Sequence, residues 1–310
     1  MQTLTEIRAL LEDAGLTPHK RFGQNFLFEQ NLMDKVLDLA DVQPGQVVLE
    51  VGPGTGSLTE ELLARVGEAG RVVSAEIDRG LCRLLEGRLG ARPNFTLICG
   101  DALAGKHAIE PRILEALGPR ADLVANLPYN IATPLVAQCL LDSWAVLRGG
   151  AAGGVLFSRM TFTIQQEVAQ RLVAGPQSGS YGPVSVIVAL LGRAQMGPVV
   201  PAAAFWPRPT VVSRIVRVDF DATAAAQLRD AGTLKALLAT VFGQRRKQLG
   251  SVIHRKNAPF ATDAFEAAIA KAGIPPTVRG ETLTPAHYLA IANSLADAGH
   301  APTGPVELEE

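Results

Sequence analysis

An amide, a proline and an aromatic ring stand together where an apolar run ends. Residues 121–125 read as a buried strand, and Asn126, Leu127, Pro128 and Tyr129 follow it directly. An amine on an aromatic ring is a poor nucleophile, but if the Asn126 oxygen and a main-chain carbonyl of the turn accept its hydrogens, its lone pair points at an incoming methyl group. Pro128 has no N–H to compete for the substrate, and Tyr129 offers a face on which a displaced base can stack. The group predicts methyl transfer to a ring amine, against the alternative of a surface turn in which proline only ends the strand.

The glycine-rich stretch "LEVGPGTGSLTEEL" is a second candidate for chemistry. It runs from a predicted strand through Gly52, Gly54 and Gly56 into a helix, and glycines at such a turn allow a ligand to approach the backbone closely. The third glycine comes one residue earlier than in the GxGxxG pattern that holds a dinucleotide pyrophosphate. With Glu50 near the strand end, this spacing favours S-adenosylmethionine over a nicotinamide cofactor. A plain strand–helix turn remains the alternative.

Carboxylates follow the next two predicted strands. Glu76 ends the run 71–77 and Asp101 follows the run 95–100. Ligands of open α/β sheets bind at the carboxyl ends of the strands. There Glu76 could accept hydrogen bonds from both ribose hydroxyls of the ligand, and Asp101 could accept one from its adenine amino group. Each acid alone could equally be a helix N-cap or a solvated side chain.

These groups require a sheet to position them, and the chain alternates β-rich and helical runs. Strands are expected at 46–52, 71–77, 95–100, 121–126, 153–158, 183–191 and 211–220. Helices are expected between them, and also at the N-terminus, 1–15, and over 234–253. This βαβ pattern predicts an α/β fold with a doubly wound, mostly parallel seven-stranded sheet. The strand signal stops after Phe220, which predicts a domain over 1–221, a small all-helical domain over 222–298 and a disordered acidic tail over 299–310.

Composition narrows the class of protein. The 310 residues suggest two domains, with 47% apolar and 19% charged residues and no 18-residue apolar stretch for a membrane span. Cys82, Cys99 and Cys139 lack metal or disulfide spacing, so we expect no metal and a reducing cytoplasm as the setting. The sequence shows no apolar heptad repeat of the kind that forms oligomers, so we expect a monomer.

Positive charge is concentrated in one stretch although the net charge is only −1. No acid occurs between Asp230 and Asp263, where Arg245, Arg246 and Lys247 are followed by two more basic residues, Arg255 and Lys256. This run predicts RNA binding through phosphate neutralisation, against the usual alternative of a solvated helix face.

Eight motifs together resemble the rRNA adenine N6,N6-dimethyltransferase family, and the C-terminal "RGETLTPAHYLAIANSL" resembles its small-subunit (16S) branch, which is associated with kasugamycin sensitivity. The motifs are "KRFGQNFL" (20–27), "EVGPGTGSLT" (50–59), "AEID" (75–78), "GDAL" (100–103), "NLPYNIATPL" (126–135), "YGPVSV" (181–186), "VPAAAFWPRPTVVSRIVR" (200–217) and "FGQRRKQL" (242–249).

The resemblance implies a class I, Rossmann-like methyltransferase fold with S-adenosylmethionine as cofactor. By motif, the methyl-donor contacts fall on Asn25, Leu27, Gly52, Glu76, Asp101 and Asn126, to which the glycine-rich turn adds Gly54. Phe205 would cover the other face of the target base, unless it is a core aromatic. Gln166 stands where family members often carry a lysine, which leaves any RNA contact there in doubt.

The predicted function is therefore S-adenosylmethionine-dependent N6,N6-dimethylation of two adjacent adenosines in a hairpin loop near the 3′ end of small-subunit rRNA, with the rRNA held in a 30S-like particle. The alternative from another class is a ribosome-assembly factor of the same fold that binds RNA without catalysis. A DNA adenine methyltransferase is disfavoured by the helical C-terminal region and by the family resemblance.

Overall fold

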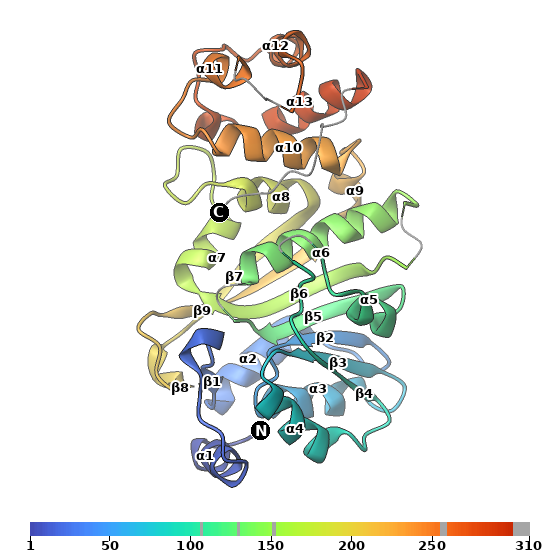
Figure 1. Ribbon diagram of the computed structural model, residues 1–310, viewed down its shortest axis with the longest axis vertical. Coiled ribbons are helices and arrows are strands. Elements are labelled where there is room, and N and C mark those ends of the chain that lie inside the picture. Colours follow the sequence, from blue (N-terminus) through green and yellow to red (C-terminus); the bar gives the residue numbers. More distant parts are fainter. Residues whose placement is uncertain (106–107, 129–130, 151–152, 255–258, 300–310) are drawn as a thin grey trace.

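The structure, a computed structural model, describes residues 1–105, 108–128, 131–150, 153–254 and 259–299. A seven-stranded sheet forms its centre, with a helical region at one end (Figure 1). The strands of this sheet are β2 (Val47–Val51), β3 (Arg71–Glu76), β4 (Phe95–Cys99), β5 (Arg120–Asn126), β6 (Leu156–Gln165), β7 (Gly192–Val200) and β9 (Ser213–Phe220).

The strand order β4-β3-β2-β5-β6-β9-β7 identifies a doubly wound sheet. The first five strands in this order are parallel, whereas β9 runs antiparallel to both β6 and β7. The chain reverses its direction of winding between β2 and β5, so their carboxyl ends flank a crevice that can receive a ligand.

Alternate residues of the strands face two apolar layers, as the pleat of a sheet requires. Val48 and Val72 belong to the apolar cluster on one face, and Leu49 and Val73 belong to the cluster on the other. The first face is covered by α2 (Gln30–Ala40), α3 (Ser57–Val66) and α4 (Arg79–Leu89), and the second by α5 (Pro111–Leu117), α6 (Ala132–Leu147) and α8 (Pro183–Leu191).

The prediction of a strand over 183–191 is wrong, because this segment is the helix α8. Its β-branched residues resemble a buried strand, but a short run that is apolar on every side does not distinguish the two structures. Gly182 and Pro183 begin the helix, with the Ser185 hydroxyl accepting from the Gly182 N–H at 3.1 Å. The seventh strand of the sheet is instead β7, the edge strand over 192–200.

The C-terminal region is helical, as predicted, but one of the expected helices is broken into two. The expected helix over 234–253 ends at Phe242, and a turn at 243–248 separates it from the next helix. The helices are α10 (Ala231–Phe242), α11 (Leu249–Ile253), α12 (Thr262–Lys271) and α13 (Pro285–Asp297), with α9 (Ala222–Ala225) before them and α7 (Gln166–Leu172) after β6.

One apolar cluster runs from the sheet into these helices. It joins Leu123 and Phe162 of the sheet to Phe265 and Tyr288 of the C-terminal region. The Tyr181 hydroxyl, just before α8, donates to the Leu283 carbonyl at 2.9 Å inside this cluster. The predicted boundary at 221/222 therefore falls between segments that share a core.

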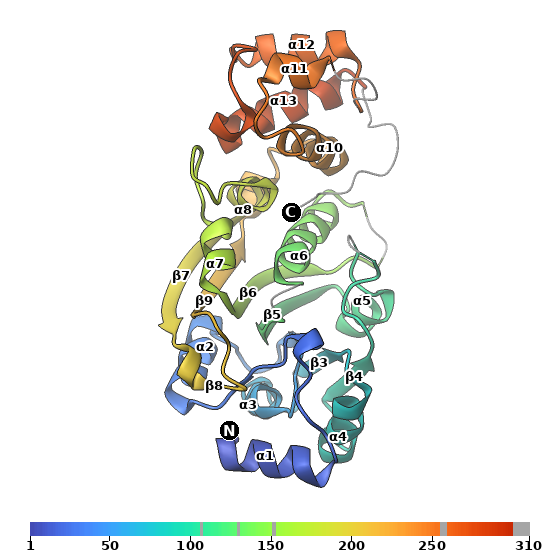
Figure 2. The ribbon, with the colours of Figure 1, turned by 60° about the vertical axis from the view of Figure 1, so that its left-hand side comes forward.

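The N-terminal segment lies across the end of the sheet opposite the C-terminal helices (Figure 2). Helix α1 (Leu4–Asp13) confirms the expected N-terminal helix and begins in a capping box between Thr3 and Glu6. A 3-10 turn (Lys20–Phe22) leads to the short strand β1 (Phe26–Leu27), which pairs antiparallel with β8 (Phe205–Trp206). Two further 3-10 turns are Ala202–Ala204 and Gly280–Thr282. Among the described residues, no helix is both long and apolar enough to cross a membrane.

Candidate active site

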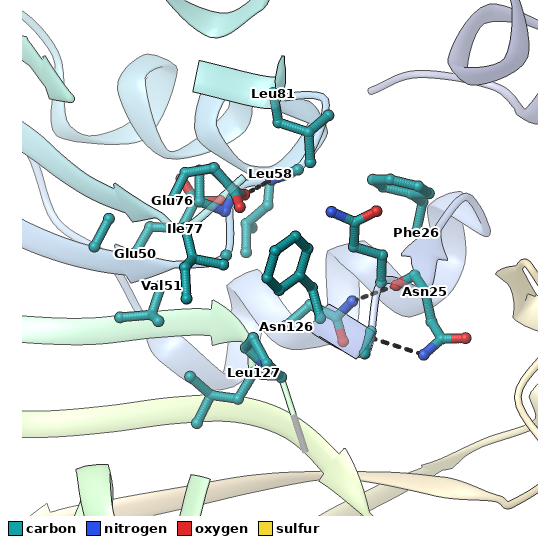
Figure 3. A pocket seen from close by; sticks show the side chains of 18 of the residues that line it. Asn25, Phe26, Glu50, Val51, Leu58, Glu76, Ile77, Leu81, Asn126 and Leu127 are labelled. Atoms are coloured by element: carbon teal, nitrogen blue, oxygen red, sulfur yellow. Dashed lines mark hydrogen bonds between the residues drawn. The ribbon is translucent and has the colours of Figure 1, made fainter. Parts of the chain in front are cut away.

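A cavity at the carboxyl ends of β2, β3, β4 and β5 contains the predicted site residues (Figure 3). It is lined by Asn25, Leu27, Gly52, Gly54, Glu76, Asp101, Asn126, Leu127 and Pro128. Tyr129, predicted to stack on the base, lies outside the described residues. The structure thus gathers into one cavity side chains that are up to about one hundred positions apart in the chain.

The glycine-rich turn lies at the centre of this cavity. Gly52, Gly54 and Gly56 have φ of 73°, 62° and 87°, a conformation that other residues rarely adopt. A Cβ on Gly54 would lie 2.8 Å from a ring carbon of Phe26, and one on Gly52 would lie 3.2 Å from Pro128. The turn therefore needs glycine both for its backbone and for the close approach of its neighbours.

Glu76 is almost fully enclosed, with 4% of its surface exposed. One carboxylate oxygen accepts from the Gly54 N–H at 3.2 Å and the other from the Asp78 N–H at 2.9 Å. Burial raises the pKa of Glu76 to about 7, and these two hydrogen bonds only partly oppose the effect. A ligand with hydroxyl groups would supply further donors to this carboxylate.

Glu50 is a second buried acid in the cavity wall. Its Oε2 accepts from the hydroxyls of Thr59, at 2.7 Å, and Ser74, at 2.9 Å. Burial raises its pKa to about 7, and the negative charge of Glu76 acts in the same direction. Two acids of raised pKa therefore stand at the ends of β2 and β3.

Asn126 ends β5 and faces the N-terminal segment across the cavity (Figure 3). Its Nδ2 donates to the Asn25 carbonyl oxygen at 2.9 Å. A carbonyl only accepts, so this contact fixes which way the amide is turned. The next residue is held as well, because the Leu127 N–H donates to the Thr163 carbonyl of β6 at 3.2 Å.

Asp101 and Asn25 occupy the more open part of the cavity. Asp101 is exposed, and its Oδ1 accepts from the Leu103 N–H at 3.0 Å. The Asn25 side chain is half-buried and donates to the Gly23 carbonyl at 2.9 Å. Both side chains belong to loops, so their contacts can change when a ligand enters.

Comparison with known proteins identifies the family. Residues 15–297 match the family described as Ribosomal RNA adenine dimethylase. The chain belongs to the ribosomal RNA adenine dimethylase family. This confirms the resemblance seen in the sequence motifs.

Two similar proteins carry the name ribosomal RNA small subunit methyltransferase A. The protein from Pelotomaculum thermopropionicum is 34% identical over 300 residues, which cover 94% of this chain and 96% of the relative. The protein from Phenylobacterium zucineum is 37% identical over 303 residues, which cover 97% and 96%. Both similarities extend over nearly the whole chain, C-terminal helices included.

Solved structures support the fold of this dimethylase. A dimethyladenosine transferase from Plasmodium falciparum matches with a TM-score of 0.65 at 21% identity, covering 88% of this chain and 98% of that one. The 23S rRNA methyltransferase ErmE matches with a TM-score of 0.57 at 24% identity, covering 88% and 100%. The predicted class I methyltransferase fold, with its helical C-terminal part, is thereby confirmed.

The residues predicted to contact RNA occupy different environments in this dimethylase. Arg246 and Lys247 are exposed on the turn between α10 and α11. Arg245 is instead engaged, since its guanidinium contacts Glu281 at 2.7 Å and the Ser178 carbonyl at 3.1 Å. Arg255 and Lys256 lie outside the described residues.

Phe205 lies in the apolar cluster beneath the sheet, with 2% of its surface exposed. It pairs with Leu27 across the β1–β8 ladder. Its ring is not accessible to a base in this arrangement, so the predicted contact with the substrate remains a prediction that requires β8 to move. Gln166 begins α7, where its N–H donates to the Val212 carbonyl at 3.0 Å.

A second, larger cleft lies between α6, α8 and α10 of the dimethylase. Three cations line it, one each from α7, α10 and the following turn: Arg171, Lys235 and Arg245. Ile131, just before α6, lines the catalytic cavity, whereas Thr133 on the first turn of that helix lines the cleft. The two hollows are therefore neighbours across the start of α6.

Sequence reasoning missed several residues of the cavity wall. Ile77 is 44% exposed at the end of β3, an unusual position for a large apolar side chain that suits a flat ligand. Gln24 donates to Asp78 at 3.0 Å and so connects the loop before β1 to α4. Ile77 could have been predicted from the sequence, because it is an apolar residue directly after an acid at a strand end. Nothing in the sequence around Gln24 indicated its position in the cavity.

Proposed function

We propose that this protein uses S-adenosylmethionine to dimethylate N6 of two adjacent adenosines in a hairpin loop near the 3′ end of small-subunit rRNA. The observation that carries the proposal is the amide of Asn126, which is held in the same cavity as the acids that end β3 and β4. Its Nδ2 donates to the Asn25 carbonyl, so its Oδ1 is the amide atom that can accept from a substrate amine.

The cavity fits S-adenosylmethionine by its shape and its polar groups. The backbone of the glycine turn lines the cavity, Glu76 can accept from ribose hydroxyls, and Asp101 can accept from an adenine amino group. Asn25, Leu27, Gly52 and Gly54 would surround the methionine end. When bound, the sulfonium supplies a strongly electrophilic methyl group.

Asn126 would prepare the substrate nitrogen for this methyl group. Its Oδ1 and a main-chain carbonyl of the 126–129 turn would each accept one N6 hydrogen, which draws the lone pair out of the ring. Pro128 packs against Gly52 and fixes the turn, and it adds no N–H donor. The methylated nitrogen then loses one proton to water, and the single hydrogen that remains can donate to one acceptor, which allows the second transfer.

The cleft beside the cavity would hold the rRNA strand. Lys235 of this cleft and the exposed Arg246 and Lys247 can neutralise phosphates on the path from α6 to the C-terminal helices. We place the rRNA in a 30S-like particle in the cytoplasm, with a single copy of the protein acting on it.

The central test is the variant Asn126→Ala with unmethylated small subunits as substrate. We expect at least a hundredfold loss of turnover, about 3 kcal/mol of transition-state stabilisation. Binding of S-adenosylmethionine should remain within severalfold, because Glu76 and the glycine turn are unchanged. Mass spectrometry of the digested rRNA measures dimethyladenosine, and primer extension locates it.

Glu76→Ala provides the comparison, since it should lose cofactor binding as well as turnover. Full dimethylation by Asn126→Ala would refute the assignment of this residue. Rescue of a deletion strain by Glu76→Ala without methylated adenines would favour the assembly-factor alternative instead.

A further inference from the structure

Helix α1 contributes one residue to the cavity lining, and the residues before it contact the glycine-rich turn, although no predicted site residue lies in this segment. This segment precedes residue 15, where the match to the dimethylase family begins. It lies at the end of the molecule occupied by α3 and α4 (Figures 1 and 2). Ile7 of α1 is fully buried and lines the cavity.

Gln2 is bound to the glycine-rich turn through both ends of its amide. Its Nε2 donates to the Thr55 carbonyl at 3.1 Å, and its Oε1 accepts from the Thr55 hydroxyl at 2.7 Å. Its main-chain N–H donates to the Ser57 hydroxyl, at the start of α3, at 3.2 Å. Gln2 is 6% exposed and Thr55 is 1% exposed. Breaking these bonds would leave buried polar groups without partners, which is costly.

These bonds act on the part of the turn that meets Glu76. Thr55 stands between Gly54 and Gly56, two residues of positive φ that lack a side chain to restrict the backbone of the turn. The Gly54 N–H donates to Glu76 at 3.2 Å. Arg88 also donates to the Thr55 carbonyl, so the turn is held from α4 and from the N-terminal segment together.

A second set of contacts attaches α1 to the β1–β8 ladder and to α4. Ile7 and Leu11 form an apolar cluster with Phe26 and Leu81. The Arg8 guanidinium lies over the Trp206 ring, 5.1 Å from its centre. The helix therefore packs against Phe26 and Trp206 of the β1–β8 ladder, and the Phe26 ring in turn lies against Gly54 of the glycine turn.

We infer that residues 2–13 are part of the methyl-donor site and that Gln2 is a positioning residue for the glycine-rich turn. The inference rests on the proposed function, because it takes S-adenosylmethionine to be the ligand of the cavity. Without Gln2 the turn is no longer preorganised, and binding must order it. Affinity for the methyl donor then falls, whereas the transfer step in the loaded enzyme is unaffected.

The test compares Gln2→Ala with the wild-type protein in full-length form. Titration calorimetry should show the Kd for S-adenosylmethionine raised roughly tenfold, the loss typical of a buried hydrogen bond. The KM for S-adenosylmethionine should rise by the same factor on small-subunit substrate. Neither kcat at saturating S-adenosylmethionine nor the KM for the subunit should change by more than about twofold.

Two further variants separate positioning from general stability. Thr55→Val removes the hydroxyl that donates to Gln2 Oε1 and keeps the main-chain carbonyl that accepts from Gln2 Nε2. The double variant with Gln2→Ala should therefore bind no more weakly than Gln2→Ala alone. Val66→Ala shortens a fully buried side chain at the far end of α3. It should lower Tm and leave the Kd unchanged.

Each result bears on the inference. An unchanged Kd in Gln2→Ala, or an equal rise in Val66→Ala, overturns it while the proposed function stands. Additive losses in the double variant also overturn it, because the two residues would then act separately. Failure of the wild-type protein to bind S-adenosylmethionine overturns the proposed function and this inference with it.

Discussion

At the scale of single residues, the two buried acids make the protein sensitive to pH. Burial raises the pKa of Glu76 and of Glu50 from the usual 4.5 to about 7. For a raised pKa the protonated form is favoured by folding, so this contribution to stability is present below about pH 4.5 and is lost as pH rises through about 7. The protein without ligand should therefore become less stable between these values.

Binding of S-adenosylmethionine should depend on pH in the opposite sense. Ribose hydroxyls donate more strongly to the ionised carboxylate of Glu76, and about a tenfold smaller fraction is ionised at pH 6 than at pH 8 for a pKa near 7. We expect the Kd to rise by up to about tenfold from pH 8 to pH 6, as measured by calorimetry.

Variants assign this pH dependence to one acid. The charge of Asp78 also raises the pKa of Glu76, and the charge of Glu76 raises the pKa of Glu50. Glu76→Gln should bind S-adenosylmethionine weakly at both pH values. Glu50→Gln should keep the step, that is, the rise in Kd from pH 8 to pH 6. A step retained in Glu76→Gln and lost in Glu50→Gln would contradict the assignment.

At the scale of elements, the basic residues of the turn between α10 and α11 differ in their contacts. Arg246 and Lys247 are exposed, whereas Arg245 holds Glu281 and the Ser178 carbonyl. The Gln177 N–H also donates to the Glu281 carbonyl at 2.9 Å, so Arg245 closes a small network that fixes the loop before α8. The three adjacent basic residues are therefore not equivalent.

This difference predicts distinct effects on binding of the small subunit. Reversal of Arg246 and Lys247 to Glu should weaken binding at least about tenfold and lower the slope of log K against log salt by roughly two, one for each lost phosphate contact. Filter binding at several salt concentrations measures both quantities.

Arg245→Gln is the matched comparison on the same turn. It should lower Tm more than it changes the salt slope, because its partners are within the protein. Equal salt slopes for all variants and the wild type would show that the turn does not contact phosphate.

At the scale of the whole molecule, the continuous apolar cluster predicts a single unfolding transition for the sheet and the C-terminal helices. The buried Tyr181 hydroxyl bonds across the two regions to Leu283, whereas the Tyr288 hydroxyl bonds within the C-terminal region, to the Gly280 carbonyl at 2.9 Å. Each change to Phe should cost about 1–3 kcal/mol and lower Tm by a few degrees.

Calorimetry distinguishes this from two independent domains. If the regions unfold together, both variants shift the same transition. Two separate transitions, with Tyr288→Phe moving only one of them, would contradict a shared core and support the boundary at 221/222.

The sequence by itself determined the order of the site along the chain. Glycine spacing, acids at strand ends and the Asn126 turn are local signals, because each depends on a few neighbouring residues and on a sheet whose carboxyl ends meet at one edge. Gly52, Gly54, Glu76, Asp101 and Asn126 were therefore predicted to share one site, together with the parallel part of the sheet. Asn25 and Leu27 followed only from the family resemblance, and Ile77 was missed.

Tertiary structure decided what depends on contacts between distant segments. The run 183–191 forms a largely buried helix that packs against α6 and the sheet, and β7 takes the sheet edge in its place. Phe205 is buried in the core, and Arg245 forms an ion pair with Glu281, unlike the exposed Arg246 and Lys247 that follow it. Gln2 reaches the glycine turn only in the folded chain, because a hydrogen bond between residues 53 positions apart leaves no trace in local composition or periodicity.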